Sequence, residues 1–341
     1  MKSDKKFMEF AIELAKKGIY TTSPNPSVGC IITEKNKILS KAYHLRSGSD
    51  HAEVLALKKL NKRINSKMNM YVSLEPCCHT GKTGPCTKSI IDSGIKNVFV
   101  STLDPNPKVK GKGVKELRNN GINVNVGLCK KKSQEINKGF FKRIIKKTPY
   151  VIAKQALSSD FKINGSKNKW ISNSKSRTDV QYFRAESCAI LVSSKTIKTD
   201  NPSLKVKLKK NDLGLKDNIK HPLRIVLDTN LSLDLNKYKF FPKAQVFIFM
   251  TSTYGEGDAP SNADQFAYKF KKYKQLKTIK YTVLGFGSKS YPKFCSFAED
   301  INSLLSQEDN YSELYPFFKI NNQDANEYLS WEKKLISRFN S

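Results

Sequence analysis

Three residues that can bind a metal stand at informative spacings in the first third of this chain. His51 begins the tripeptide His-Ala-Glu, and Cys77 and Cys86 each directly follow a proline. One imidazole and two thiolates form a ligand set that hydrolytic enzymes use for catalytic zinc, with the fourth position left to water. The spacing therefore predicts that His51, Cys77 and Cys86 bind Zn2+.

Glu53 stands two residues after the candidate ligand histidine. A carboxylate at this offset can move protons to and from the activated water, as in zinc deaminases that act on cytosine or adenine rings. Glu53 is therefore the candidate catalytic residue. Cys78 and His79 lie close by, so a closed four-ligand structural site stays open. The prolines before Cys77 and Cys86 favour those two, because proline fixes the turn at a helix start, where the dipole stabilises a thiolate.

Alternating strand-like and helix-like segments predict the scaffold around these residues. Expected strands are residues 28–33, 38–43, 70–74, 97–102 and 122–126. Expected helices are residues 7–17, 51–60, 87–93 and 114–120. This alternation indicates an α/β domain of three layers with a mostly parallel sheet, in which both metal-bearing turns sit at helix N-termini.

The rest of the chain reads as two further units, the first of which begins near Pro149. Its expected elements are a strand at 150–156, a helix at 174–186, strands at 189–192 and 222–228, and a solvated Lys-rich loop at 208–220. Beyond residue 244, the strands expected at 246–250 and 280–284 each run into a loop of Ser, Thr, Gly and Tyr, which suits a flat anionic cofactor. The predicted domains are residues 1–147, 148–243 and 244–341.

Composition narrows the class of protein. The 341 residues are 38% hydrophobic, enough for at least two cores, and they contain neither a long apolar span nor a signal-peptide pattern. We therefore expect a cytoplasmic protein with no membrane partner. Seven cysteines, three of them candidate metal ligands, disfavour a disulfide framework.

The net charge of +31 would ordinarily suggest a nucleic-acid partner. Only eight of the 61 basic residues are arginine, however, and the lysines are scattered among Asn and Ile, as an AT-rich coding bias would produce. We therefore expect no nucleic acid. A phosphorylated small molecule would be attracted by the same field.

Several motifs carry a family resemblance over residues 1 to about 240. They are Asn25-Pro26-Ser27-Val28-Gly29-Cys30, Pro76 to Cys86, Asp104-Pro105-Asn106-Pro107, Asn137-Lys138-Gly139-Phe140, Lys169-Trp170-Ile171 and Asp200-Asn201-Pro202. With them the chain resembles the bifunctional riboflavin-biosynthesis deaminase and reductase family. The resemblance implies a cytidine-deaminase-like domain that deaminates 2,5-diamino-6-(5-phosphoribosylamino)pyrimidin-4-one at zinc. It also implies a dihydrofolate-reductase-like domain that reduces the ribosyl group to ribityl with NADPH.

The resemblance assigns roles to individual residues and implies a homodimer. It makes His51, Cys77 and Cys86 the zinc ligands, Glu53 the proton shuttle and Asn25 a neighbour of the pyrimidine. In the second domain it places NADPH near Ala156, Trp170, Thr196, Asp200 and Thr229, and the anionic substrate near Asn168, Arg184, Leu204 and Lys207. Two residues depart from the family pattern: Phe161 replaces a usual Gly, and Asn168 replaces a usual Ser.

The reductase pattern stops after the strand that ends near Asp228. Residues 244–341 instead resemble part of a flavodoxin-like FMN domain, with Thr251 to Pro260 as its second flavin loop and Leu284 to Cys295 as its third. The first, phosphate-binding loop of that fold has no counterpart, so we expect no FMN. The reductase domain is thus expected to be truncated and impaired, continuing into a partial flavodoxin-like segment.

Three alternative functions stay open. One is a deaminase without reductase activity. Another is a nucleic-acid base deaminase, which would use the positive charge but which the long spacing from Cys77 to Cys86 disfavours. The third is an electron-transfer flavoprotein. The sequence also leaves open whether the C-terminal segment completes the reductase sheet or leaves an unpaired edge.

Overall fold

The computed structural model describes residues 2–81, 83–163, 170–216, 218–228, 233, 246–261, 263, 266–271 and 278–339. The chain divides into two compact units. The first contains residues 1–188 and 205–223, and the second contains residues 189–204 and 224–341.

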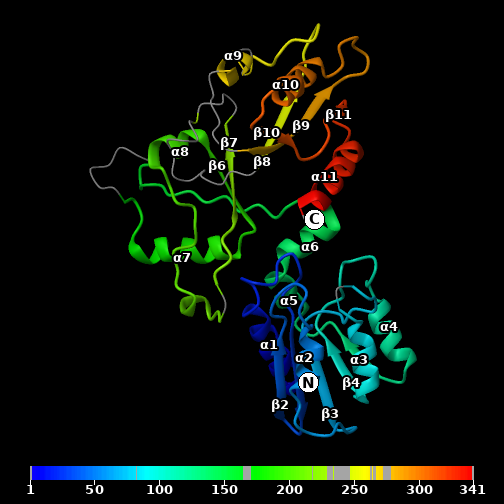
Figure 1. Cartoon of the computed structure of the whole chain (residues 1–341). Helices are drawn as coiled ribbons and strands as arrows, with labels where there is room; N and C mark the ends of the chain where they lie inside the picture. The colour runs from blue at the N-terminus through cyan, green and yellow to red at the C-terminus, as the bar shows by residue number, and fades with distance from the viewer. Residues whose placement is uncertain are drawn as a thin grey trace. The chain divides into compact units, whose positions relative to one another are not determined.

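A five-stranded sheet in the order β2-β1-β3-β4-β5 forms the centre of the first unit (Figure 1). Its strands are β1 (Gly29–Glu34), β2 (Lys37–Tyr43), β3 (Met68–Val72), β4 (Asn97–Val100) and β5 (Asn123–Val126). Strand β1 is antiparallel to both β2 and β3, whereas β3, β4 and β5 are mutually parallel. Four of the five strands therefore run in the same direction, as expected for a mostly parallel sheet. Strand β1 runs in the opposite direction.

Helices cover both faces of this sheet, which confirms the three-layer prediction. Helices α2 (Ala52–Lys58), α3 (Cys86–Ser93) and α4 (Lys112–Asn119) pack on one face, and α1 (Lys2–Lys16) and α5 (Lys130–Ile136) on the other. The period of two along a strand separates the cores: Val98 and Val100 face the first group of helices, and Phe99 faces the second.

Helix α1 lies unusually close to the sheet at Gly29. A Cβ atom added at this glycine would overlap the carbonyl oxygen of Ala11, so only glycine allows this approach. The Tyr71 ring stacks on Phe99 with centroids 4.6 Å apart, and its hydroxyl donates to Asp4 of α1 at 2.7 Å. The helix is thus fixed by close backbone packing and by one partly buried hydrogen bond.

The segment after β5 differs from the sequence-based expectation. It forms α5 and then α6 (Lys138–Lys146), neither of which was anticipated, followed later by the expected helix α7 (Ser174–Glu186). The strand expected at 150–156 is wrong, because these residues are irregular and exposed and pair with no described strand. Its apolar residues favour an extended chain, but a strand also needs a neighbour for its N–H and C=O groups.

The Lys-rich segment at 208–220 is mostly exposed and irregular, as expected, but one of its described residues is buried. Its central 3-10 turn, Asn211–Leu213, buries Leu213 in a small core with Ala185 and Val206. Tyr20 from the N-terminal part of the unit packs against this core. The loop therefore connects α7 to the rest of the first unit.

The second unit contains two separate sheets. Strands β6 (Ala189–Ser193) and β7 (Leu223–Leu227) pair with each other, and α8 (Ser194–Asp200) follows β6. The other sheet contains β8 (Val246–Ser252), β9 (Ile279–Gly287), β10 (Tyr311–Glu313) and β11 (Phe318–Asn321). Strand β9 pairs in parallel with all three of its partners, β8 along one edge and β10 then β11 along the other.

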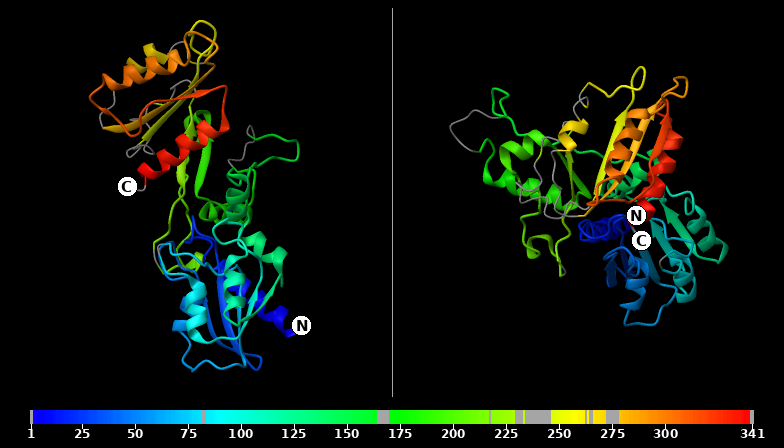
Figure 2. Two further views of the ribbon diagram at one scale, coloured as in Figure 1. Left: turned by 90° about the vertical axis from the view of Figure 1, so that its right-hand side faces the viewer. Right: turned by 45° about the horizontal axis from the view of Figure 1, so that its top comes forward.

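The four-stranded sheet has helices on both faces (Figure 2). Helices α9 (Phe266–Lys271) and α10 (Ser296–Ser306) cover one face over a cluster that includes Phe249 and Val283, and α11 (Ala325–Phe339) covers the other at Leu284 and Ile320. The C-terminal segment thus builds its own core and, within the described residues, does not join β6 and β7 into one sheet. No helix of the described part is both long and apolar enough to span a membrane.

Candidate active site

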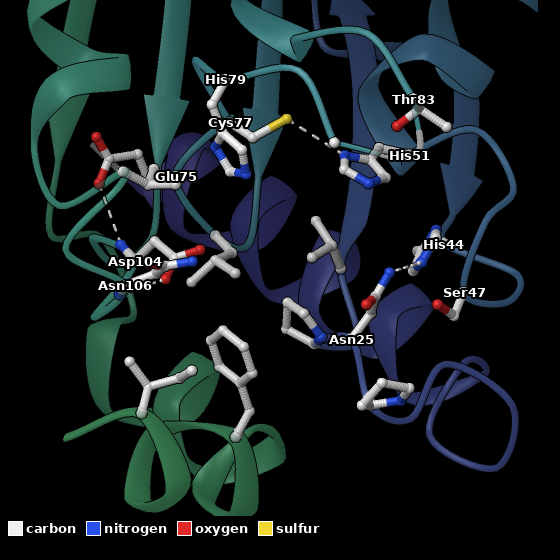
Figure 3. A pocket seen from close by; sticks show the side chains of 18 of the residues that line it. Asn25, His44, Ser47, His51, Glu75, Cys77, His79, Thr83, Asp104 and Asn106 are labelled. Carbon is white, nitrogen blue, oxygen red and sulfur yellow. Dashed lines mark hydrogen bonds between the residues drawn. The ribbon is translucent and has the colours of Figure 1, made fainter. Parts of the chain in front are cut away.

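The three predicted ligands converge at two helix starts beside the sheet. His51 is the N-cap of α2, Cys86 is the first residue of α3, and Cys77 lies in the loop after β3. His51 Nδ1 is 3.1 Å from Cys86 Sγ and 3.5 Å from Cys77 Sγ, and all three ligand atoms lie within 4.8 Å of one another (Figure 3). A tetrahedral zinc ion, at about 2.0 Å from nitrogen and 2.3 Å from sulfur, would hold N and S roughly 3.5 Å apart. The donor set and its spacing therefore fit zinc.

Neighbouring hydrogen-bond donors stabilise the thiolate form of Cys77. The Cys86 thiol, helped by the His51 imidazole and the Cys86 backbone N–H, lowers the pKa of Cys77 to about 4. The same shared proton, together with burial, raises the pKa of Cys86. A thiolate is the form of cysteine that binds metals, so a cation at this point would replace the proton shared by the two sulfurs.

Cys78 and His79 do not complete a closed four-ligand site. Cys78 Sγ points to the carbonyl oxygen of Lys108 at 3.7 Å, and the metal-ligand cluster of the described residues contains only His51, Cys77 and Cys86. His79 lines the adjoining cavity, and its Nδ1 is buried without a hydrogen-bond partner in the described structure. A three-ligand site with a position open toward the cavity matches a catalytic rather than a structural centre.

Glu53 lies in the first turn of α2 beside this cluster. The residue is 3% exposed, and its Oε2 has no hydrogen-bond partner among the described residues. Burial raises the pKa of this carboxyl. A buried carboxyl oxygen is normally satisfied, so its lack of a partner beside a cavity marks a position for a water or a substrate atom.

A cavity of about 430 Å³ opens in front of the cluster and Glu53. Asn25 lines it as expected, and its Nδ2 lies 3.2 Å from His44 Nε2. His44 Nδ1 in turn lies 3.2 Å from the carbonyl oxygen of Asp50, and burial lowers the pKa of His44. A neutral imidazole held by Asp50 therefore fixes the orientation of the Asn25 amide.

Two cavity walls were not assigned from the sequence. Asp104 and Asn106 form one wall, and burial raises the pKa of Asp104 to about 6. The motif that contains them was visible, but nothing in it indicated the direction of its side chains. Helix α6 supplies the other wall through Phe140, Arg143 and Ile144.

Glu75 joins the cysteine loop to the Asp104 wall. Its carboxylate accepts three backbone N–H groups, from Asp104 at 3.1 Å, Gly111 at 2.9 Å and Val114 at 3.1 Å. Gly113 lies so close to this loop that an added Cβ would overlap the carbonyl oxygen of Pro76. The start of α4 and the loop that bears Cys77 are therefore packed as one piece.

The residues assigned to the reductase are distributed over both units. Ala156, Trp170, Arg184 and Lys207 belong to the first unit, and Thr196, Asp200 and Leu204 to the second. Asn168 and Thr229 lie outside the described residues.

Their local surroundings differ. Trp170 is 60% exposed, with the Arg177 guanidinium 4.7 Å from its ring centre. Arg184 donates to the carbonyl oxygen of Lys205, whereas Leu204 is buried with Ile197. These assignments stay predictions.

Comparisons with known families match three stretches of the chain. Residues 1–102 match the cytidine and deoxycytidylate deaminase zinc-binding region, and residues 149–261 match the RibD C-terminal domain. Residues 227–329 match the flavodoxin family and overlap the second stretch.

Individual relatives agree with these matches. The chain is 44% identical over 232 residues to the riboflavin biosynthesis protein RibD of Buchnera aphidicola subsp. Baizongia pistaciae, covering 65% of this chain and 62% of that protein. For RibD of Haemophilus influenzae the identity is 38%, covering 71% and 67%. A diaminohydroxyphosphoribosylamino-pyrimidine deaminase from Buchnera aphidicola subsp. Schizaphis graminum is 52% identical, covering 41% of this chain and 95% of that protein.

A solved structure extends the likeness to the fold. The diaminohydroxyphosphoribosylaminopyrimidine deaminase/5-amino-6-(5-phosphoribosylamino)uracil reductase of Thermotoga maritima is 29% identical, with a TM-score of 0.66 over 96% of this chain and 84% of that one. In sequence the chain spans less than two thirds of the Baizongia relative. It nevertheless shares both family regions and the fold, and it belongs to the RibD family of riboflavin biosynthesis proteins.

Proposed function

We propose that this protein is a zinc-dependent deaminase of riboflavin biosynthesis. Its substrate would be 2,5-diamino-6-(5-phosphoribosylamino)pyrimidin-4-one, whose ring amino group is hydrolysed to release ammonia. The observation that carries the proposal is the triad of His51, Cys77 and Cys86 within 4.8 Å, with the Glu53 Oε2 atom, which has no hydrogen-bond partner among the described residues, beside the same cavity. The name of the Schizaphis graminum relative, which the chain covers almost completely, supports the substrate class.

The residues of the cavity have distinct tasks in this reaction. His51, Cys77 and Cys86 would hold zinc, which when bound lowers the pKa of water toward neutrality. Glu53 takes up the proton that this water loses, delivers it to a ring nitrogen and assists the departing amino group as it leaves as ammonia. The raised pKa of Glu53 suits a group that must both accept and release a proton. Asn25, fixed by His44, orients the edge of the pyrimidine.

The test uses the full chain loaded with zinc. Purified protein is expected to release ammonia from the phosphoribosyl diaminopyrimidinone, and Glu53→Gln is expected to abolish release while keeping one zinc per chain. Glu135→Gln is the matched control, since Glu135 is an exposed carboxylate paired with Lys138. Ammonia release by Glu53→Gln at the wild-type rate would exclude Glu53 as the proton shuttle.

We propose that the second activity of the family, NADPH reduction of the ribosyl group, is weak here. In this proposal Ala156, Trp170, Thr196, Asp200 and Thr229 contact NADPH, and Asn168, Arg184, Leu204 and Lys207 contact the substrate. The match of residues 149–261 to the RibD C-terminal domain supports the assignment. The irregular segment at 150–156 and the separate pair β6–β7 support the impairment, because a reductase sheet would bring such strands together.

Loss of NADPH absorbance in the presence of the deaminated product measures this second activity. We expect a rate far below the rate of ammonia release by the same preparation. An NADPH rate equal to the deaminase rate would contradict the impairment.

The remaining parts of the proposal concern organisation. We infer domains at 1–147, 148–243 and 244–341, a cytoplasmic homodimer, and no nucleic-acid partner. The flavodoxin match of residues 227–329 and the parallel sheet around β9 make FMN binding the alternative to test for the last domain. We expect colourless protein with no flavin absorbance after incubation with FMN, and light scattering after size exclusion measures the dimer.

A further inference from the structure

Helix α6 closes the cavity on the side away from the metal ligands. In Figure 3 this helix lies at the bottom of the view, while His51 and Cys77 lie at the top. Phe140, Arg143 and Ile144 of α6 line the same cavity as the ligands. A molecule that fills the cavity therefore contacts the metal site with one end and α6 with the other.

Arg143 is the only lysine or arginine among the described residues that line this cavity. Its Nη2 donates to the carbonyl oxygen of Pro24 at 2.9 Å, and its guanidinium lies 5.8 Å from the centre of the Phe140 ring. These contacts hold the side chain before any ligand arrives, which reduces the entropy lost on binding. The Pro24 bond uses one of the five N–H donors of a guanidinium.

The charges in the cavity are unevenly placed. The carboxyl groups of Glu53, Glu75 and Asp104 come from α2, the cysteine loop and the segment after β4, and no described lining residue of α6 carries a carboxyl group. A dianionic group would be repelled by these carboxylates and attracted to Arg143. The planar fork of a guanidinium matches two oxygens of a phosphate.

We propose that Arg143 binds the phosphate of the substrate and makes the cavity selective for phosphorylated pyrimidine ribosides. This inference rests on the proposed deaminase function and adds the residue that distinguishes the phosphorylated from the dephosphorylated substrate. The pyrimidine then reaches Glu53 and the metal ligands, while the phosphate stays at α6.

Arg143→Gln tests the assignment in the full, zinc-loaded chain. Loss of a charge-assisted bidentate contact is expected to raise KM for the phosphoribosyl substrate by about 10- to 100-fold while kcat changes less than about twofold. For the dephosphorylated riboside the variant and the wild type are expected to have equal kcat/KM. Arg143→Lys keeps the charge without the fork and is expected to give an intermediate KM.

Two control variants separate phosphate recognition from charge and from folding. Lys142→Gln removes the same charge from the neighbouring, exposed position of α6, which does not line the cavity. Arg118→Gln removes a guanidinium whose Nη2 also donates to a backbone carbonyl, that of Val124, on α4. Both controls are expected to keep the wild-type KM.

Two kinetic outcomes overturn the proposal: an unchanged KM for the phosphorylated substrate, or equal losses on both substrates. Calorimetric titration with ribose 5-phosphate gives a readout independent of turnover. Arg143→Gln is expected to bind one equivalent fewer than the wild type, while any binding at the site proposed near Arg184 and Lys207 is retained in both. Absence of binding to the wild type, or an equal number of equivalents in the two proteins, overturns the proposal as well. If the wild type releases no ammonia, the proposed function fails, and this titration still decides the role of Arg143.

Discussion

Asn137 and Ser27 are joined by a pair of hydrogen bonds across 110 positions of sequence. Asn137 Oδ1 accepts from the Ser27 N–H at 2.8 Å, and Asn137 Nδ2 donates to the Ser27 carbonyl oxygen at 2.9 Å. Asn137 is 5% exposed and stands directly before α6, while Ser27 ends the loop that carries Asn25. The two cavity walls that carry Arg143 and Asn25 are therefore held in register by one amide.

Asn137→Asp is expected to weaken the connection between α6 and the Ser27 loop. The substitution keeps the shape but sets a carboxylate oxygen against the Ser27 carbonyl oxygen, which should lower the free energy of unfolding by about 2 kcal/mol. It should also raise KM for the deaminase substrate more than it lowers kcat. Urea unfolding and steady-state kinetics measure these effects. Asn120→Asp is the control, because Asn120 makes its hydrogen bond to the carbonyl oxygen of Glu116 at the surface, and an equal effect there would refute the argument.

Glu75→Gln is expected to disturb the metal site without touching a ligand. The carboxylate accepts N–H groups on both oxygens, whereas in either orientation an amide turns its NH2 toward at least one of the donors Asp104, Gly111 and Val114. We expect about 10- to 100-fold weaker zinc binding in a chelator competition. The absorption spectrum of the cobalt-substituted protein should shift as well.

Glu13→Gln provides the comparison for Glu75→Gln, since Glu13 is exposed and paired with Lys16. It should leave both zinc affinity and the cobalt spectrum unchanged. Wild-type zinc affinity and spectrum in Glu75→Gln would show that the three hydrogen bonds accepted by Glu75 do not position Cys77.

Asp104 should make the protein less stable as the pH rises from about 4 to about 6. Burial raises its pKa from 3.8 to about 6, so the folded protein keeps a proton that the unfolded chain has already lost. The stability gained from that proton is complete below the unfolded pKa and is lost as the pH passes the folded pKa. The total loss is at most about 3 kcal/mol.

Asp104→Asn removes this titration. The variant should match the wild type near pH 4 and exceed its unfolding free energy near pH 7, by up to about 3 kcal/mol. Urea midpoints across the pH range measure the difference, with the exposed Asp92→Asn as control. A variant that is less stable than the wild type at pH 7 would mean that the charged form is the stabilised one.

Phe161 occupies a backbone conformation that favours glycine. Its φ is +61°, its ring is 81% exposed, and its N–H donates to the Ser158 carbonyl oxygen in a tight turn. Phe161→Gly should therefore stabilise the protein by about 0.5–1 kcal/mol, since a left-handed residue with a Cβ is strained. Phe161→Ala keeps the Cβ and should bring no gain in the same urea experiment. A gain from alanine equal to that from glycine would assign the effect to the ring instead.

The metal cluster could be predicted because its residues lie in short, recognisable sequence motifs. His51 and Glu53 are two residues apart, and the prolines before Cys77 and Cys86 indicate the turns that carry the two sulfur ligands. The α6 wall could not be predicted in the same way. Phe140 and Arg143 reach the cavity from a helix that Asn137 and Arg143 join to a loop more than a hundred residues earlier, and no local pattern encodes these contacts.

The irregular segment at 150–156 shows that a local preference for extended backbone can predict a strand that does not form. Val151 and Ile152 favour an extended chain, and the sequence predicted a strand there. Both are exposed in the structure, because extended residues become a strand only when another strand is available to pair with them. Helix α7, whose bounds match the prediction, has its own N-cap in Asn173, so its start is decided locally.

The residues that line the cavity are confined to one part of the sequence. Every described residue that lines it falls between Pro24 and Ile144, whereas the flavodoxin-like match begins at residue 227. Mutations that accumulate toward the 3′ end of the gene would therefore leave these lining residues unchanged. Selection for the first reaction alone would then preserve the beginning of the gene and leave its later codons free to drift.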